Sequence, residues 1–264
     1  MTKLNKPIVL AAAMASLLGA LEAKAQFTYL DNDLLLNFRQ TDGGASDLNL
    51  TVNLGSVLTF RNLTGTTPIT QFTASQLTTA FTDFNNLAFS VVATEKSAPA
   101  TAPYVNNTYW ATVGRSVNGV QNTAPTRGSS LSQGNESALI ASIGSGAQDG
   151  GSDLSNTAAT TVDGSAFSYH AFAGSGTFGG NISYNIEKST GSGFTGFVQA
   201  DFFEVIPGSG DSTYLGYFEF RDTGAMSFVS AVVTPVPEPT TAGLVSASAV
   251  FLFALRRRFG TRKS

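Results

Sequence analysis

Residues 48–54 read Leu-Asn-Leu-Thr-Val-Asn-Leu, an alternation of apolar and polar residues with a period of two. Successive side chains of a β-strand point to opposite faces, so the four leucine and valine residues share one face and predict a strand packed on a core. Far along the chain, Asp222-Thr223-Gly224 separates two strand-like segments and predicts the turn of a hairpin. Both patterns favour an antiparallel β-protein.

Further segments rich in β-branched and aromatic residues are bounded by turn-forming residues and also predict strands. They are residues 33–38, 57–60, 87–93, 108–113, 166–173, 182–187, 193–206, 213–220 and 225–233. One short helix is expected after the capping box Thr73-Ala74-Ser75-Gln76, because the apolar residues that follow recur at helical spacing: Leu77, Ala80, Phe81 and Phe84. The expected fold is all-β, an antiparallel β-sandwich or jelly roll with one short helix.

Two more expectations concern the second half of the chain. Residues 114–164 are the richest in Gly, Ser, Asn and Thr and predict long loops, with a helical turn at residues 136–143. In the strand 213–220, alternation is expected to place Tyr214, Gly216, Phe218 and Phe220 on one face.

The composition excludes several kinds of site. The chain has no Cys and a single His, which excludes a Cys-based zinc site, a disulfide framework, a thiol nucleophile and a multi-His metal site. Residues 26–234 hold 7 basic and 16 acidic residues, a net charge of −9. This acidic segment argues against nucleic acid as a partner, because phosphates require a basic surface.

The N-terminus has the three-part layout of a secretory signal peptide. Lys3 and Lys6 precede an apolar run of 14 residues, 8–21, and Ala23-Lys24-Ala25 then forms an A-x-A cleavage site. As a helix the apolar run is about 21 Å long, too short for a hydrocarbon core of about 30 Å. Residues 1–25 are therefore expected to be removed as a signal peptide whose apolar run forms a short helix, with Ala23 and Ala25 defining the cleavage site.

The C-terminus has a second three-part layout, in residues 235–264. Pro237-Glu238-Pro239 comes first, followed by 16 uncharged residues, 240–255, that predict a helix about 24 Å long. The basic end, residues 256–263, holds Arg256, Arg257, Arg258, Arg262 and Lys263. An apolar helix followed by such a cluster predicts a transmembrane stop-transfer segment whose basic end stays in the cytoplasm.

This combination resembles the PEP-CTERM sorting tail of exported proteins of Gram-negative bacteria. The resemblance rests on the tripeptide, the helix, the Arg cluster and their C-terminal position, together with the signal peptide, and residues 259–264 extend beyond the Arg cluster. It implies recognition and cleavage by the membrane protease exosortase after a transient stay in the inner membrane. It also implies a final place at the cell surface or in an extracellular matrix of exopolysaccharide or biofilm. An ordinary C-terminal anchor is the alternative for the same segment.

The expected mature domain, residues 26–234, offers acids and one histidine as candidate catalytic groups. His170 is expected to be an ordinary strand residue, because no G-x-S-x-G elbow accompanies it. Asp201 and Glu204, three residues apart on a strand, are expected on opposite faces, and Glu219 and Asp222 straddle a turn. Neither pair has a spacing diagnostic of a glycosidase.

Two further groups suggest binding. Asp31-Asn32-Asp33 and the segment 42–47 offer oxygen ligands for Ca²⁺ but do not match an EF-hand loop, and turn formation is the simpler interpretation. Tyr104, Tyr109 and Trp110 could form an aromatic platform for sugar rings, or belong to the core. The leading interpretation is a non-enzymatic exported protein without catalytic residues, metal or cofactor. A carbohydrate-binding module is the alternative, and a polysaccharide-active enzyme is third.

Overall fold

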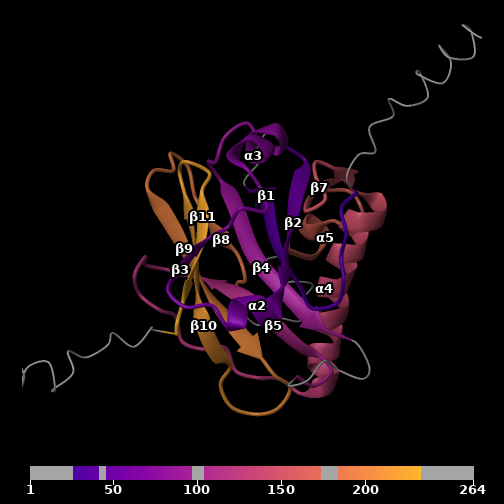
Figure 1. Ribbon diagram of the computed structural model, residues 1–264, viewed down its shortest axis with the longest axis vertical. Coiled ribbons are helices and arrows are strands. Elements are labelled where there is room, and N and C mark those ends of the chain that lie inside the picture. The colour runs from indigo at the N-terminus through magenta and orange to yellow at the C-terminus, as the bar shows by residue number, and fades with distance from the viewer. Residues whose placement is uncertain (1–25, 42–45, 97–103, 174–183, 233–264) are drawn as a thin grey trace, which may run out of the picture.

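The computed structural model describes residues 26–41, 46–96, 104–173 and 184–232. The expected signal peptide with Ala23 and Ala25 lies outside the described residues. So does the expected tail with Pro237, Glu238, Pro239 and its basic end. Within the described residues the chain forms a mostly-β domain with one large antiparallel sheet and four helices (Figure 1).

The sheet has 11 strands, and its neighbours follow the order β3-β11-β10-β9-β5-β4-β1-β2-β7-β6, with β8 paired to β4. The strands are β1 Asp33–Gln40, β2 Leu48–Ser56, β3 Thr66–Pro68, β4 Leu87–Glu95, β5 Thr108–Gly114, β6 Ser152–Asp153, β7 Ala158–Val162, β8 Lys188–Ser189, β9 Phe197–Val205, β10 Thr213–Arg221 and β11 Met226–Ser230. The helices are α2 Val57–Arg61, α3 Ala74–Ala80, α4 Ser130–Gly150 and α5 Tyr169–Ala173.

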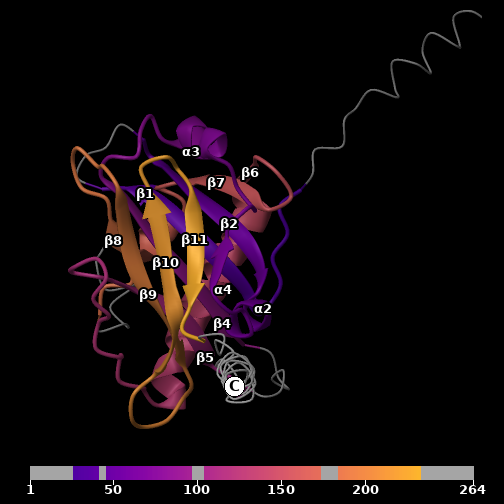
Figure 2. The same cartoon turned by 60° about the vertical axis from the view of Figure 1, so that its left-hand side comes forward.

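The sheet curls so that its two halves face one another across an inner core (Figures 1 and 2). The ring centroids of Phe38 on β1 and Phe220 on β10 lie 5.4 Å apart, although β4, β5 and β9 separate these strands in the sheet. Phe60 and Phe228 likewise meet at 5.6 Å. Contacts between aromatic rings at these distances add to the burial of their apolar area and hold the two halves together.

A second, outer core lies on the other side of the sheet, beneath α4 and α5. Leu35 of β1 and Phe203 of β9 belong to it, whereas their strand neighbours Leu36 and Phe202 belong to the inner core. From α4, Ile140, Ile143 and Ala147 enter the outer core at helical spacing. The central strands are therefore buried on both faces.

The alternation at residues 48–54 is confirmed in β2. Leu50, Val52 and Leu54 lie together in the inner core. The opposite face of β2 is also covered, and its polar residues find partners there: the side-chain amide of Asn49 donates to Asp163 at 2.7 Å. The capping box is confirmed as well, because Thr73 and Gln76 bond reciprocally at the start of α3.

Three segments expected as strands are not strands. Residues 57–60 form α2, which begins because the Ser56 hydroxyl accepts a hydrogen bond from the Leu58 amide. Residues 166–173 hold α5 in place of a strand. In the segment 182–187, the described residues 184–187 form no strand, and the short β8 follows them.

The expectation of long loops over residues 114–164 holds only for residues 115–129, and the expected helical turn at 136–143 is part of a much longer helix. The segment holds the 21-residue helix α4 and the strands β6 and β7. Its Gly and Ser residues have low helix propensity, but burial of Ile140 and Ile143 against the sheet outweighs that preference.

The expected orientation of the β10 side chains is wrong for part of the strand. A register shift between Tyr214 and Gly216 marks a β-bulge, and Gly216 has a φ of +141°. Phe218 and Phe220 lie in the inner core as expected, but Leu215 packs on that core too. Tyr214 instead packs on the outer core, with its ring 5.5 Å from Phe203.

Candidate functional site

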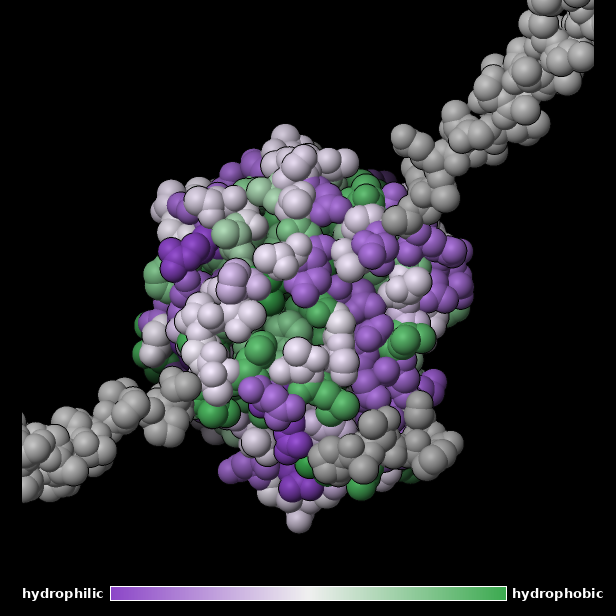
Figure 3. Space-filling model, viewed as in Figure 1, coloured by the Kyte–Doolittle hydropathy of each residue, from purple (hydrophilic) through white to green (hydrophobic). Residues whose placement is uncertain are grey.

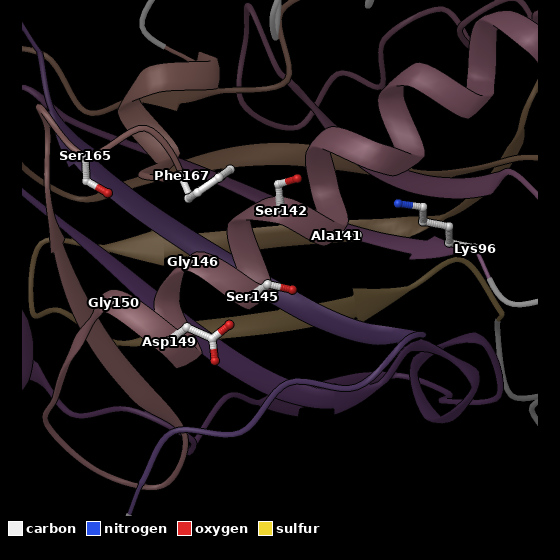
Figure 4. Close-up of a pocket in the computed structure, with 9 residues that line it drawn as sticks. All are labelled: Lys96, Ala141, Ser142, Ser145, Gly146, Asp149, Gly150, Ser165 and Phe167. Atoms are coloured by element: carbon white, nitrogen blue, oxygen red, sulfur yellow. The ribbon is translucent and has the colours of Figure 1, made fainter.

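A hollow lies along the exposed side of α4. A cavity of about 420 Å³ is bounded by α4, by Lys96 and by the segment holding Ser165 and Phe167 (Figure 4). A second cavity of about 370 Å³ shares Lys96 and Ala141 with the first and extends to Tyr29 and Asp31. We call the two together the α4 groove. It is lined by Tyr29, Asp31, Lys96, Ala141, Ser142, Ser145, Gly146, Asp149, Gly150, Ser165 and Phe167.

Two glycines of α4 explain why chain segments flank the helix so closely. A Cβ atom on Gly144 would lie 2.4 Å from the ring of Tyr29, and one on Gly146 would lie 2.5 Å from the Cβ atom of Phe167. Both distances are too short for real atoms, so only glycine permits these approaches. The Tyr29 and Phe167 segments thus come to lie against the helix.

Small residues of α4 form the floor between these segments. Ala141, Ser145 and Asp149 are spaced four residues apart, so they lie on one face of the helix. The Ser142 hydroxyl donates to the carbonyl of Ala138 at 2.8 Å, which fixes its orientation. Short side chains here leave space above the helix that Leu or Phe would fill.

The groove presents both kinds of hydrogen-bonding group. Lys96 can only donate, the Asp149 carboxylate only accepts, and the hydroxyls of Ser145 and Ser165 do both. The Phe167 side chain is 56% exposed. Hydrophilic residues also dominate the side of the molecule where α4 lies (Figure 3).

The Tyr29 end of the groove is acidic. The two carboxylate oxygens of Asp31 accept from the Lys96 amide at 3.2 and 3.0 Å. Burial, and then the charges of Asp31 and Asp33, raise the pKa of the Tyr29 hydroxyl above its usual range, so it stays protonated. The residues named for the groove thus combine hydroxyls, carboxylates and one ammonium group, and include no histidine.

No protein-family model, curated protein or solved structure matches this chain. Its function must therefore be argued from its own residues.

His170 lies on α5, so its expected place on a strand is wrong. Its backbone N–H donates to Asn49 at 3.0 Å, and its Nδ1 lies 3.4 Å from a carboxylate oxygen of Asp163. These contacts hold α5 against β2 and the segment after β7.

The two acids of β9 are on opposite faces, as expected, and both are buried. Asp201 on the outer face pairs with Arg115 at 2.7 Å and accepts from Asn122. Glu204 on the inner face accepts from Trp110 Nε1 at 3.3 Å and pairs with Arg61. They cannot act as a pair on one substrate, because the sheet separates them.

The acids near the last hairpin have structural partners. Glu219 accepts from the side-chain amide of Gln199 at 2.9 Å, and Asp222 accepts from the Gly196 amide at 2.7 Å.

The first candidate calcium segment, residues 31–33, is held by hydrogen bonds within the protein. Asp33 caps a turn by accepting from the Leu30 amide at 2.8 Å, and the side-chain amide of Asn32 donates to Glu95 at 3.1 Å. Across the described ranges, no group of three or more His, Cys, Asp or Glu residues is placed to hold a metal. Residues 42–45 of the other candidate calcium segment lie outside those ranges.

Of the two alternatives for the aromatic residues 104, 109 and 110, the structure shows core positions and no platform for sugar rings. Tyr104, Tyr109 and Trp110 are all buried. Tyr104 packs edge-on against Trp110 in the inner core at 4.7 Å, while Tyr109 lies in the outer core. Sequence analysis missed the α4 groove, for which the signal was a run of Ala, Ser and Gly at four-residue spacing in 141–150.

None of the helices in the described part of the chain combines the length and apolar character needed to cross a bilayer. The expected membrane helix at residues 240–255 lies outside that part.

Proposed function

We propose that this is a non-enzymatic exported protein of the cell envelope or of an extracellular polysaccharide matrix, sorted through its C-terminal tail. The observation that carries the proposal is the order of Pro237-Glu238-Pro239, an uncharged segment of 16 residues and the Arg256–Arg258 cluster. Exosortase cuts the tail in this proposal, after removal of the signal peptide behind Ala25. Until that cut, the tail serves as a transient inner-membrane anchor.

The position of the last strand supports this division of the chain. β11 ends at Ser230, and Val232, the last described residue, is half exposed. Only a few residues separate it from Pro237. Pro fixes its own φ and keeps the preceding residue extended, so the tripeptide is suited to lie exposed to a protease.

The arrangement of the sheet supports the expected β-sandwich class. Its two halves face one another, although they belong to one continuous sheet.

The test separates cleavage from membrane insertion. Glu238→Ala should leave insertion intact and block processing, because Glu238 precedes the helix. Replacing Arg256, Arg257 and Arg258 with Gln should instead release uncut protein across the membrane, because each Arg costs about 2.5–3.5 kcal/mol at the bilayer centre and so halts translocation.

Blotting of cell fractions with an antibody to the β-domain measures the size and place of each variant. Thr234→Ala, a change outside the tripeptide, is the control and should be processed like the parent. If Glu238→Ala protein were cut and released normally, the segment would be a simple anchor and the sorting proposal would fail. N-terminal sequencing of the released protein should begin at Gln26.

Carbohydrate binding is the second candidate function. The α4 groove favours it, because polar groups of both kinds and a half-exposed aromatic ring line one open hollow.

A further inference from the structure

We propose that the α4 groove binds an uncharged sugar chain, with Asp149, Ser145 and Lys96 bonding its hydroxyls and Phe167 lying against a sugar ring. This inference rests on the second candidate function and adds its site and ligand class. It does not depend on how the C-terminal tail is processed.

The hydrogen-bonding groups of the groove match a ligand that both donates and accepts. Each sugar hydroxyl has one donor and two acceptor sites. Asp149 can accept from one hydroxyl, Lys96 can donate to another, and Ser145 and Ser165 can do either. In Figure 4 Lys96 and Asp149 lie toward opposite ends of the helix stretch that forms the floor, with Ser142 and Ser145 between them. The polar partners are thus spread along the groove.

An apolar ligand fits this lining poorly. It would cover Asp149, Lys96 and the two hydroxyls without offering them hydrogen bonds, and covering such groups unpaired is costly. A sugar ring combines an apolar face with polar edges. The exposed Phe167 side chain and Ala141 can contact that face, while the edges meet the polar groups.

Charge selects against an acidic ligand. Lys96 is the one basic residue lining the groove, and Asp31 and Asp149 outnumber it. The segment 26–234 as a whole carries a net charge of −9. A polyuronate or a phosphate-rich chain would therefore be repelled over the approach as well as at the site.

The form of the groove suits an internal part of a chain. Its two cavities adjoin at Lys96 and Ala141, one reaching Phe167 and the other Tyr29. The volumes, about 420 and 370 Å³, lie in the usual range for sites of small ligands. α4 also lies on the side of the domain away from the end of β11 (Figures 1 and 2), so a tail held at a membrane leaves the groove accessible.

Isothermal titration of the purified protein with four tetrasaccharides tests the inference. The neutral probes are cellotetraose, maltotetraose and chitotetraose, and tetragalacturonate is the acidic probe. At least one neutral probe should bind and tetragalacturonate should bind more weakly. Asp149→Ala should weaken binding about tenfold or more, as expected for the loss of hydrogen bonds to a charged group. Ser145→Trp should abolish binding by filling the groove.

Asn135→Trp is the matched control, because it adds the same bulk at an exposed position of α4 outside the groove. It should bind like the parent, and circular dichroism should show all variants folded. If a neutral probe bound the parent and both groove variants equally, carbohydrate binding would stand and this site would be wrong. If no probe bound, both would fail, while the tail assay would still decide the sorting proposal separately. Preferential binding of tetragalacturonate would overturn the ligand class.

Discussion

Arg115 and Arg221 pair with carboxylates in opposite environments. The Arg115 and Asp201 side chains are 5% and 0% exposed, and the guanidinium also bonds Gln199 at 2.9 Å and lies 4.2 Å from the Tyr217 ring centroid. Arg221, which pairs with Glu219, is 54% exposed. Removing one member of a buried pair leaves the other charge without compensation, whereas an exposed pair is screened by water.

Arg115→Met is therefore expected to lower the free energy of unfolding by about 3–5 kcal/mol. Arg221→Met should lower it by no more than about 1 kcal/mol. Urea unfolding of the two variants and the parent measures both effects. Equal losses would show that the Asp201 carboxylate finds water or another partner when Arg115 is gone.

At the scale of single elements, α4 depends on its glycines. An Ala at position 144 gains helix propensity of about 1 kcal/mol, but its Cβ atom would lie 2.4 Å from the Tyr29 ring. We expect Gly144→Ala to destabilise the domain by about 1–3 kcal/mol, the usual cost of overpacking. Gly150→Ala on the same helix meets no atom within 4 Å and should leave stability equal or higher. Thermal unfolding compares them, and a stabilised Gly144→Ala protein would refute the close packing of Tyr29.

The elements also show what sequence patterns can predict. Alternation located β2, and richness in β-branched and aromatic residues between turn-forming residues located β1, β4, β5, β9 and the last hairpin. The same reasoning predicted only a helical turn at residues 136–143 within α4, because the Ser and Gly residues of this helix are typical of loops. The full helix forms because Ile140 and Ile143 meet the sheet. Alternation also misplaced Tyr214, because it treats Gly216, the local sign of a bulge, as an ordinary strand residue. The small residues of 141–150 could indicate the floor of the groove, but its walls could not be predicted, since they come from three segments distant in sequence that meet at α4.

At the scale of the whole molecule, one buried acid couples stability to pH. Glu136 of α4 is 3% exposed, and its Oε2 atom has no hydrogen-bond partner. Burial raises the pKa of Glu136 above its ordinary value of 4.5. The charge of Glu136 acts on Tyr109 and Tyr184, whose hydroxyls form a hydrogen bond of 3.1 Å with each other. Burial raises the pKa of Tyr109 to about 12. Neither tyrosine supplies a positive charge.

Because the folded-state pKa of Glu136 is the higher one, folding favours the protonated acid. Its contribution to stability is present below about pH 4.5 and is lost as the pH rises through the folded-state value. Glu136→Gln should remove this loss, so the variant should gain stability relative to the parent as the pH increases. Urea unfolding between about pH 4 and about pH 8, the range around an ordinary Glu pKa, gives the comparison. Asp149→Asn, an exposed acid of the same helix, is the control, and a constant difference between parent and Glu136→Gln would contradict the prediction.

Because β3 pairs with β11, the domain cannot finish folding before its last strand is available. Pro68 of β3 lies opposite Ser227 of β11, and Phe228 fills the inner core beside Phe60, more than half the chain away. Contacts between such distant residues raise the contact order and slow folding, because a long loop must close before they form. In a chain exported from its N-terminus, β11 is the last strand to emerge, so the core cannot close while the domain is still in transit. In the proposed export, this topology would delay closure of the core until β11 has also crossed the membrane.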